Sequence, residues 1–211
     1  MRREKRCQMS SLILKNGSMF TGIIKGLGTV TAINDRPNFR ELVIDVEDLI
    51  DKPVIGASVA VSGTCLTVTK IDQSRLSFEA MEETLKKTTT GGLVVGSKVN
   101  IEAPMKVGDE LGGHFVLGHV DGVGEVINRV TEGENTHLTF KVPADLVKYI
   151  VDKGSVAVDG ISLTVCDPKN DEFSVWLLPL TLKLTTLGDK KVGEKVNLEA
   201  DYLLKAVLGR A

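Results

Sequence analysis

The feature that most constrains the fold of this chain is a long internal repeat. The stretch Ser58-Val-Ala-Val-Ser-Gly-Thr-Cys65-Leu-Thr-Val-Thr69 recurs as Ser155-Val-Ala-Val-Asp-Gly-Ile-Ser162-Leu-Thr-Val-Cys166. The match runs without a gap from 57–103 against 154–200, with about half of the positions matching. A period of roughly 97 residues is too long for one solenoid unit, so it predicts two similar domains in one chain.

Both copies of the repeat have a recognisable beginning and end. Each closes with Val-Gly-x-Lys-Val-Asn-(Ile/Leu)-Glu-Ala, at 95–103 and at 192–200. Each opens with a glycine-rich segment, at 19–30 and at 115–126. The Gly-x-Gly runs in these segments do not match the dinucleotide-binding fingerprint, because no helical pattern follows and the third glycine is missing. Their glycines are instead typical of bulged or bent strands.

Short β-strands dominate the predicted secondary structure. We expect strands at 38–46, 75–81, 136–142 and 172–178, with further β segments at 83–85 and 180–182. We expect a helical turn at 46–52 and a helix at 143–154, which has proline in its first turn and glycine at its end. About six short strands per copy predict an all-β fold with two similar six-stranded barrels in tandem.

The repeat sets the expected domain boundaries. We expect an N-terminal extension at 1–18, a first barrel at 19–114, a second barrel at 115–200 and a short C-terminal helix at 201–211. The helix is predicted from apolar residues at helical spacing, and a neighbouring subunit is one candidate for covering them. The basic extension is either a transit peptide or residues added upstream of a start at Met19, and we favour the second interpretation.

Composition excludes several classes of function. The net charge is −2 and no basic block is present, so electrostatics gives no reason to expect a nucleic-acid partner. No apolar run approaches the roughly 18 residues of a membrane span. The cysteines are Cys7, Cys65 and Cys166. Because they are few and odd in number, they favour a reducing, cytoplasmic location. Because they lack metal-ligand spacing, we expect no metal site.

Four motifs together resemble the riboflavin synthase family. They are Met19-Phe-Thr-Gly-Ile, Gly63-Thr-Cys-Leu-Thr-Val, Gly112-Gly-His-Phe-Val-Leu-Gly-His119-Val-Asp-Gly and Val158-Asp-Gly-Ile-Ser162-Leu-Thr-Val. The resemblance covers residues 19 to about 208. It implies two Greek-key β-barrels, a C-terminal helix and a homotrimer.

The resemblance also implies a reaction, the last step of riboflavin biosynthesis. Family members are transferases that dismutate two molecules of 6,7-dimethyl-8-ribityllumazine. A four-carbon unit passes from one to the other and gives riboflavin and 5-amino-6-(ribitylamino)uracil, without a cofactor or metal. Each barrel binds one lumazine, and the active site lies between the first barrel of one subunit and the second barrel of another. Two similar sites suit a reaction between two identical substrates, because holding both makes the step effectively unimolecular.

The resemblance assigns candidate site residues by matching positions. The catalytic candidates are Cys65, Ser162, His119 and Phe20, the last of which matches a phenylalanine close to the reacting ring. Substrate-binding candidates of the first site are Gly22, Ile23, Ile24, Leu66, Thr67, Glu79, Ala80, Met81, Glu82, Glu83 and Thr84. Those of the second site are Gly118, Val120, Lys153, Leu163, Thr164, Leu177, Leu178, Pro179, Leu180, Thr181 and Leu182, and Ser58 and Asp201 match further positions nearby.

Each catalytic candidate also has an ordinary structural interpretation. Cys65 is either a buried thiol or a group that adds to the ring carbon bearing the 7-methyl group or moves a proton. His119 is either the base that removes a methyl proton or a surface histidine. His114 is a candidate for orienting the linker between the barrels. Ser162 and Thr164 are two residues apart, so on a strand they share one face, and one of them is a candidate structural hydroxyl.

Two competing functions use the same fold. Antenna proteins of luminous bacteria hold a lumazine or flavin in a duplicated barrel without catalysis. We favour the enzyme, because the candidates at positions 65, 119, 162 and 164 are all retained. A flavin-reductase-type barrel would need an additional nicotinamide-binding α/β domain, for which the chain has no room.

Overall fold

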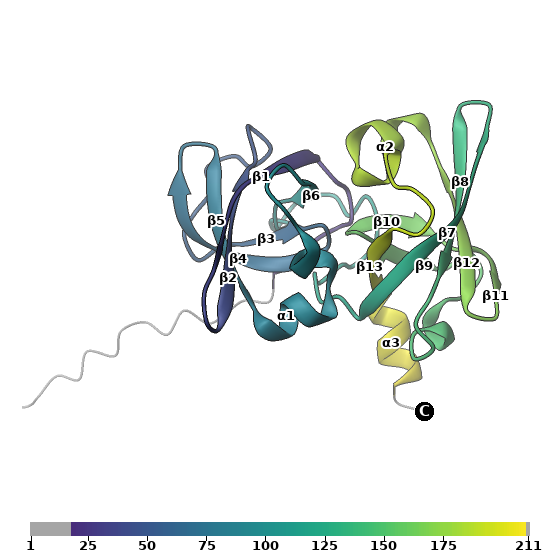
Figure 1. Ribbon diagram of the computed structural model, residues 1–211. Helices are drawn as coiled ribbons and strands as arrows, with labels where there is room; N and C mark the ends of the chain where they lie inside the picture. The colour runs from purple at the N-terminus through teal and green to yellow at the C-terminus, as the bar shows by residue number, and fades with distance from the viewer. Residues whose placement is uncertain (1–17, 210–211) are drawn as a thin grey trace, which may run out of the picture.

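Two β-barrels lie side by side in the computed structural model, which describes residues 18–209 (Figure 1). The first half contains β1 (Gly26–Asp35), β2 (Phe39–Asp45), β3 (Ser58–Val61), β4 (Thr64–Asp72), β5 (Arg75–Met81), α1 (Glu82–Lys87), a 3-10 turn (Thr89–Gly92) and β6 (Lys98–Glu102). Its strands close into a barrel in the order β1-β2-β5-β4-β3-β6. The closed Greek-key barrel expected for the first half is thus confirmed.

The second half repeats this order with one strand divided in two. It contains β7 (Gly122–Glu132), β8 (Asn135–Lys141), a 3-10 turn (Val147–Tyr149), β9 (Ser155–Val158), β10 (Ile161–Thr164), β11 (Cys166–Lys169), β12 (Glu172–Leu177), α2 (Pro179–Leu184), a 3-10 turn (Thr186–Gly188), β13 (Lys195–Ala200) and α3 (Tyr202–Leu208). The sheet order is β10-β9-β13-β7-β8-β12-β11. Because one residue separates β10 from β11 in the chain, this seven-stranded sheet curls until its two edge strands follow one another.

The second part of the divided strand, β11, pairs irregularly, and this irregularity has a local cause. Pro168 lies within β11 and has no N–H to donate to a ladder, and Asp167 beside it has a positive φ of 48°. The pairing of β11 with β12 shifts register between Cys166 and Lys169. In the first barrel Ile71 occupies the position equivalent to Pro168, and there β4 runs unbroken to Asp72.

Each barrel has its own core, formed by the inward-facing side chains that alternate along its strands. The first core includes the fully buried Leu42, Ile44, Leu76, Phe78 and Ile101. The second includes Leu138, Phe140, Phe173, Leu177 and Leu198. The rings of Phe140 and Phe173 stack with their centroids 5.3 Å apart. Two separate cores are the physical consequence of the duplication.

The structure corrects the predicted helices. Segments 83–85 and 180–182, expected as β segments, lie in the short helices α1 and α2. The signals were present in the sequence: α1 has two glutamates in its first turn and two lysines in its last, and Pro179 begins α2. The helix expected at 143–154 is only the turn Val147–Tyr149, and the helical turn expected at 46–52 is a single turn in which the N–H of Leu49 donates to the carbonyl of Val46 at 3.0 Å. Segment 143–154 instead forms a series of single turns, and it packs Leu146 and Ile150 into the second core.

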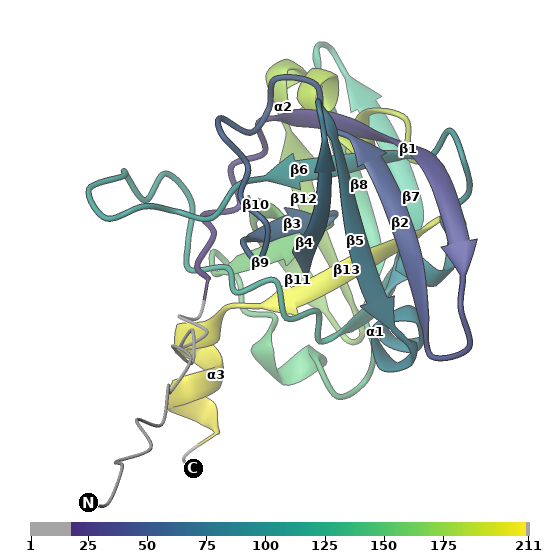
Figure 2. The ribbon, with the colours of Figure 1, turned by 90° about the vertical axis from the view of Figure 1, so that its left-hand side faces the viewer.

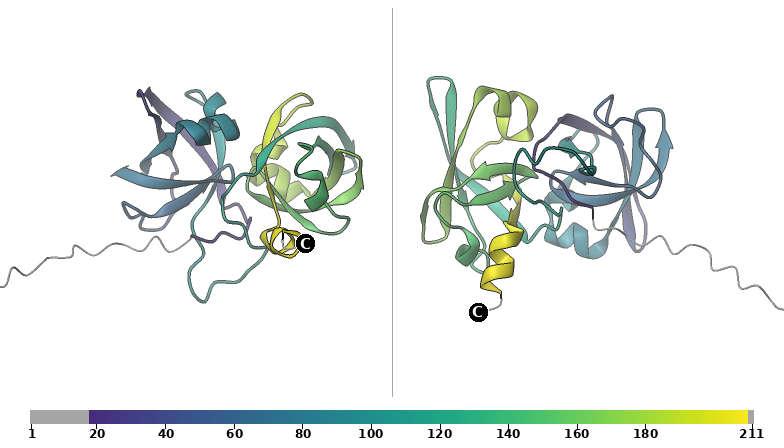
Figure 3. Two further views of the ribbon diagram at one scale, coloured as in Figure 1. Left: turned by 90° about the horizontal axis from the view of Figure 1, so that it is seen from below. Right: turned by 180° about the vertical axis from the view of Figure 1, so that it is seen from behind.

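The two barrels are related by an approximate two-fold arrangement. In Figure 1, α1 lies below the first barrel and α2 above the second, while α3 extends downward from β13. The chain after β6 forms a loop that extends away from both barrels (Figure 2). Figure 3 shows that the segments preceding β1 and β7 pass between the barrels. Within residues 18–209, no helix is long and apolar enough to span a membrane. The predicted extension 1–18 lies almost wholly outside the described residues.

Candidate active site

Two crossing segments, one before each barrel, meet at the centre of the molecule. The N–H of Phe20 donates to the carbonyl of Val116 at 2.7 Å, and the N–H of Val116 donates to the carbonyl of Phe20 at 3.1 Å. Both side chains are buried, at 0% and 1% exposed, in a small cluster with Ala60 and Ala157. Phe20 is therefore part of the inter-barrel packing, and its predicted contact with a reacting ring stays a prediction.

The crossing segments exchange partners between the barrels. The N–H of Ser162 donates to the carbonyl of Gly22 at 2.8 Å, and the N–H of Cys65 donates to the carbonyl of Gly118 at 2.9 Å. A Cβ on Gly22 would lie 2.5 Å from the Cβ of Ser162, and one on Gly118 would lie 2.6 Å from the Cβ of Cys65. The sequence comparison grouped Gly22 with Cys65 and Gly118 with Ser162. In the structure each segment instead lies over the candidate nucleophile of the other barrel.

Both glycines have the backbone conformation that favours glycine. Gly22 and Gly118 have φ values of +77° and +74°. A side chain there would be strained and would also overlap the neighbouring nucleophile. The close approach of backbone to Cys65 and Ser162 thus explains why glycine stands at these two positions.

Buried carboxylates hold the crossing segments in place. Glu102 at the end of β6 accepts hydrogen bonds from the N–H of Thr21 at 2.7 Å, from its hydroxyl at 2.7 Å and from the N–H of Gly22 at 3.1 Å. Glu199 at the end of β13 accepts from the N–H groups of Leu117 at 2.8 Å and Gly118 at 2.9 Å. Burial raises the pKa of both carboxyls, and the hydrogen bonds that they accept oppose this increase.

Ser162 on β10 has a histidine as its side-chain partner. Nδ1 of His114 lies 2.7 Å from the hydroxyl oxygen of Ser162. His114 is 8% exposed, and its Nε2 has no hydrogen-bond partner among the described residues. Burial lowers the pKa of His114, while the charge of Asp201 acts in the opposite direction. A neutral imidazole next to a hydroxyl is suited to accept its proton.

The histidine that lies beside Ser162 is His114 and not His119, whose role as a base stays a prediction. His119, the predicted base, is exposed and follows Gly118 directly, so its segment belongs to the Cys65 side. The sequence alone predicts only a linker-orienting role for His114. The sequence contains a signal for the position of His114, because the two glycines of Gly112-Gly-His114 allow another backbone segment to approach closely. A Cβ added to Gly113 would lie only 2.1 Å from the carbonyl oxygen of Thr21. Spacing alone does not show which nucleophile that approach serves.

The two nucleophile positions have different surroundings. Cys65 is partly buried and packs against the inter-barrel cluster that contains Phe20 and Val116. The repeat places Ser18 where the second copy has His114, because each residue directly precedes its crossing segment. Only the Ser162 side therefore has an imidazole at this equivalent position.

The remaining candidates divide between the outer face and the core. On β4 and β10, Cys65, Thr67, Ser162 and Thr164 point outward, whereas Leu66 is 4% exposed and faces the core. Exposed apolar side chains lie at the ends of β5 and β12, with Met81 at 57% in the first barrel and Leu178 and Leu180 at 63% and 65% in the second. The other members of these two segments alternate in burial: Glu79, Glu82, Glu83 and Pro179 are exposed, Thr84, Thr181 and Leu182 are half-buried, and Ala80 and Leu177 are buried.

Other candidates have structural contacts of their own. The carboxylate of Asp201 caps α3 by accepting from the N–H of Leu203 at 2.8 Å. Lys153 has a positive φ of 61°, and its Nζ lies 4.0 Å from the sulfur of Cys166, close to the end of β10. Ser58 pairs with Thr67 across β3 and β4, which places both on the outer face. Residues 18–209 contain no group of three or more metal-ligating side chains.

Two cavities lie away from the nucleophiles. One has a volume of about 750 Å³ beside the loop after β6, and its lining includes Ile23, Ser58 and Glu102. The other has about 780 Å³ and lies between the barrels, where Ser62, Asp159 and Lys190 contribute to its lining. Neither cavity is lined by Cys65 or Ser162.

Comparison with known proteins tests the resemblance drawn from the motifs. The lumazine binding domain model matches residues 21–104 and 117–201. The riboflavin synthase of Escherichia coli (strain K12) is 45% identical over 192 residues, which cover 90% of this chain and 90% of that protein. This chain belongs to the riboflavin synthase family. The relative from Chlamydia muridarum is 44% identical over 187 residues, covering 89% of this chain and 92% of that protein.

Solved structures agree with the family and with the duplicated fold. LumP complexed with riboflavin superimposes with a TM-score of 0.80 at 27% identity, over 86% of this chain and 98% of that one. LumP complexed with 6,7-dimethyl-8-(1'-D-ribityl) lumazine gives a TM-score of 0.78 at 26% identity with the same coverage. The family and the all-β duplicated fold predicted from sequence are confirmed. The individual site residues are placed by the structure, and their roles stay predictions.

Proposed function

We propose that this chain is a riboflavin synthase, a transferase that dismutates two molecules of 6,7-dimethyl-8-ribityllumazine. Support comes from the 40–45% identity to riboflavin synthases along nearly the whole chain. The single structural observation that carries the proposal is the doubled arrangement of a nucleophile under a crossing glycine, Cys65 under Gly118 and Ser162 under Gly22. A reaction between two copies of one molecule requires two similar holders.

The reaction balances without an external reagent. Two carbon–nitrogen bonds of the donor lumazine break, and its four-carbon unit forms new carbon–carbon bonds with the two methyl carbons of the acceptor. The hydrogens that leave those methyl groups as protons equal the hydrogens that the diaminouracil product gains on nitrogen. The protein must therefore bind, orient and move protons, which is work for hydroxyl, thiol and imidazole groups.

Ser162 and His114 supply nucleophile and base in this scheme. The hydroxyl oxygen of Ser162 adds to the ring carbon that carries the 7-methyl group, while Nδ1 of His114, 2.7 Å away, takes the hydroxyl proton. The carboxylate of Asp201 favours the imidazolium that results. On the other side the second lumazine must lose a proton from its methyl group instead, and Cys65 supplies a thiol that helps to move this proton, while the exposed His119 on the segment that covers Cys65 is the candidate base.

Assembly follows from the open character of both outer faces. Ile23, Met81, Leu178 and Leu180 are exposed apolar side chains among the substrate-binding candidates. We infer that a second copy of the chain covers them, so that the first barrel of one subunit faces the second barrel of another in a homotrimer. We infer a cytoplasmic location from the scarcity of cysteine.

One experiment separates the enzyme from the antenna alternative. The purified protein is incubated with 6,7-dimethyl-8-ribityllumazine alone, and riboflavin is followed by its absorbance. Repeated turnover with equal amounts of riboflavin and diaminouracil is expected. Stoichiometric binding without riboflavin formation would replace the enzyme by a lumazine- or flavin-binding protein, a function that the likeness to the LumP complexes would then favour.

A further inference from the structure

The motif that closes each barrel, Val-Asn-(Ile/Leu)-Glu, has no role in the scheme above. It lies on β6 as Val99–Glu102 and on β13 as Val196–Glu199. Its polar side chains are almost wholly buried, with Asn100 at 0%, Asn197 at 1% and both glutamates at 3% exposed. Buried amides and carboxylates require partners: both asparagine amides find theirs in the other half of the molecule, whereas each glutamate binds the crossing segment of its own half.

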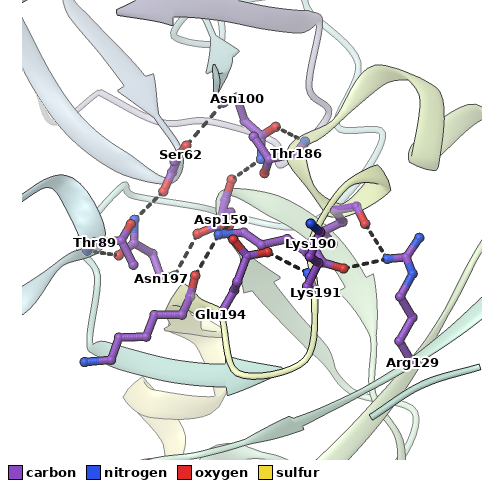
Figure 4. A network of polar contacts seen from close by, with 12 residues as sticks. Ser62, Thr89, Asn100, Arg129, Asp159, Thr186, Lys190, Lys191, Glu194 and Asn197 are labelled. Carbon is purple, nitrogen blue, oxygen red and sulfur yellow. Dashed lines mark hydrogen bonds and ion pairs between the residues drawn. The ribbon is translucent and has the colours of Figure 1, made fainter. Parts of the chain in front are cut away.

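The asparagine of each motif spans the boundary between the barrels (Figure 4). The side-chain amide of Asn100 donates to the carbonyl of Asp159 at 2.8 Å, and its oxygen accepts from the N–H of Thr186 at 2.8 Å. Thr186 lies just beyond α2, and the candidate segment 177–182 of the second barrel ends within that helix. An asparagine of the first barrel thus fixes the end of the second barrel's substrate-binding helix.

The second asparagine mirrors the first. The amide of Asn197 donates to the carbonyl of Ser62 at 2.7 Å, and its oxygen accepts from the N–H of Thr89 at 2.7 Å. Thr89 lies just beyond α1, which includes the candidates Glu82, Glu83 and Thr84. The turns that contain Ser62 and Asp159, which accept from the two asparagines, are themselves in contact. Gly63 lies so close to the other turn that a Cβ added to it would be 2.6 Å from the backbone nitrogen of Gly160.

The glutamate of each motif acts on the same side as its asparagine. Glu102 of the first barrel binds Thr21 and Gly22, and the carbonyl of Gly22 accepts the N–H of Ser162 in the second barrel. Glu199 of the second barrel binds Gly118, whose carbonyl accepts the N–H of Cys65 in the first barrel. Each carboxylate is therefore linked through one backbone residue to the opposite nucleophile.

We propose that the closing motif of each barrel positions the substrate site of the other barrel. Asn100 and Glu102 are positioning residues for the Ser162 site, and Asn197 and Glu199 are positioning residues for the Cys65 site. The inference rests on the proposed function only in naming these as substrate sites. The reciprocal arrangement links the two sites, so that loosening either motif disturbs the site on the far side of the boundary.

The test compares the two sites in each variant. Glu102→Gln and Glu199→Gln keep the shape and one acceptor oxygen, and Lys98→Ala and Lys195→Ala are matched controls on the exposed side of the same strands. Hydrogen exchange of the amides of Cys65 and Ser162 is measured by NMR without substrate. We expect Glu102→Gln to raise exchange at Ser162 about tenfold and leave Cys65 unchanged, and Glu199→Gln to do the reverse.

Kinetics supply the second readout. With 6,7-dimethyl-8-ribityllumazine as substrate, we expect Glu102→Gln to lower kcat about tenfold with little change in KM, and Glu102→Ala to lower it further. Asn100→Asp keeps the acceptor for Thr186 and is expected to lie between wild type and Asn100→Ala. If Glu102→Gln does not fold, Thr21→Val serves in its place, because it removes the hydroxyl donor to Glu102, together with the acceptor of the Ile23 N–H, and leaves the carboxylate present.

Two results would overturn the proposal. One is a change in exchange confined to the barrel that carries the substitution, and the other is an equal change at both amides, as expected of general destabilisation. The exchange measurement uses no substrate, so a protein that failed to form riboflavin would contradict the proposed function and leave this test intact.

Discussion

The N–H of Ser162 donates a hydrogen bond to the carbonyl of Gly22, 2.8 Å away, across the boundary between the two barrels. Cys65 and Gly118 form the reciprocal bond at 2.9 Å. Neither nucleophile is therefore covered by its own half of the chain. Each candidate site is built from both barrels, and changes in one half are expected to be felt in the other.

Removal of either nucleophile is expected to slow turnover while the fold is kept. Cys65 and Ser162 are only partly buried and lie on outer strand faces, so Cys65→Ala and Ser162→Ala leave the two cores intact. We expect the turnover rate to fall by a factor of up to roughly 10², with unchanged circular dichroism and melting temperature. Full activity in both variants would make the repeated stretch purely structural.

His114→Gln is expected to reduce turnover and alter its dependence on pH. Burial lowers the pKa of His114, so the imidazole stays neutral and able to accept the Ser162 proton to below pH 6.5. The stability that this neutral histidine contributes is present above about pH 6.5 and is lost as the pH falls through its lowered pKa. We expect His114→Gln to remove the acidic limb of the rate profile, whereas the control His137→Gln keeps it.

Gly118→Ala is expected to destabilise the protein strongly. The left-handed backbone at φ +74° costs a side chain about 1–2 kcal/mol, and the new Cβ would lie 2.6 Å from that of Cys65. Gly92→Ala is the matched control, because its Cβ meets nothing within 4 Å. Urea unfolding of the two variants measures the difference, and equal stability would contradict the close approach of the crossing segment.

Glu102→Gln is expected to flatten the dependence of stability on pH. Burial raises the pKa of Glu102 in the folded state, so its contribution to stability is full below about pH 4.5 and is lost as the pH rises through the raised value. A glutamine does not titrate, so the free energy of unfolding should fall less between pH 4.5 and 7. Denaturant titrations at several pH values test this, and an unchanged slope would contradict it.

Lys190→Met is expected to expose the cost of burying Asp159. The carboxylate of Asp159 is 3% exposed, and Nζ of Lys190 lies 3.6 Å from it. Burial raises the pKa of Asp159 and the lysine charge lowers it, so loss of the lysine leaves an unpaired buried charge that costs about 3 kcal/mol at neutral pH. Thermal unfolding should show recovery in Lys190→Met combined with Asp159→Asn, and little effect from the exposed control Lys191→Met.

Much of the fold could be predicted because strand patterns are local. The expected strands at 38–46 and 136–142 correspond to β2 and β8 within one or two residues. The short helix α1 was missed because it has a single apolar residue, and α2 was missed because its leucines at 180, 182 and 184 alternate with the period of a strand. Their charged and proline signals were in the sequence, but the β segments around them suggested another strand.

The sequence by itself determined the duplication, the family and the identity of Cys65 and Ser162 as equivalent positions. Those conclusions depend only on which residues follow one another along the chain. The tertiary structure alone decided that Gly22 covers Ser162, that His114 rather than His119 bonds to it, and that Asn100 and Glu102 act on the opposite barrel. These contacts form where the two similar barrels pack against each other. Aligning the repeat with itself does not show which barrel supplies the hydrogen-bond partner of a given residue.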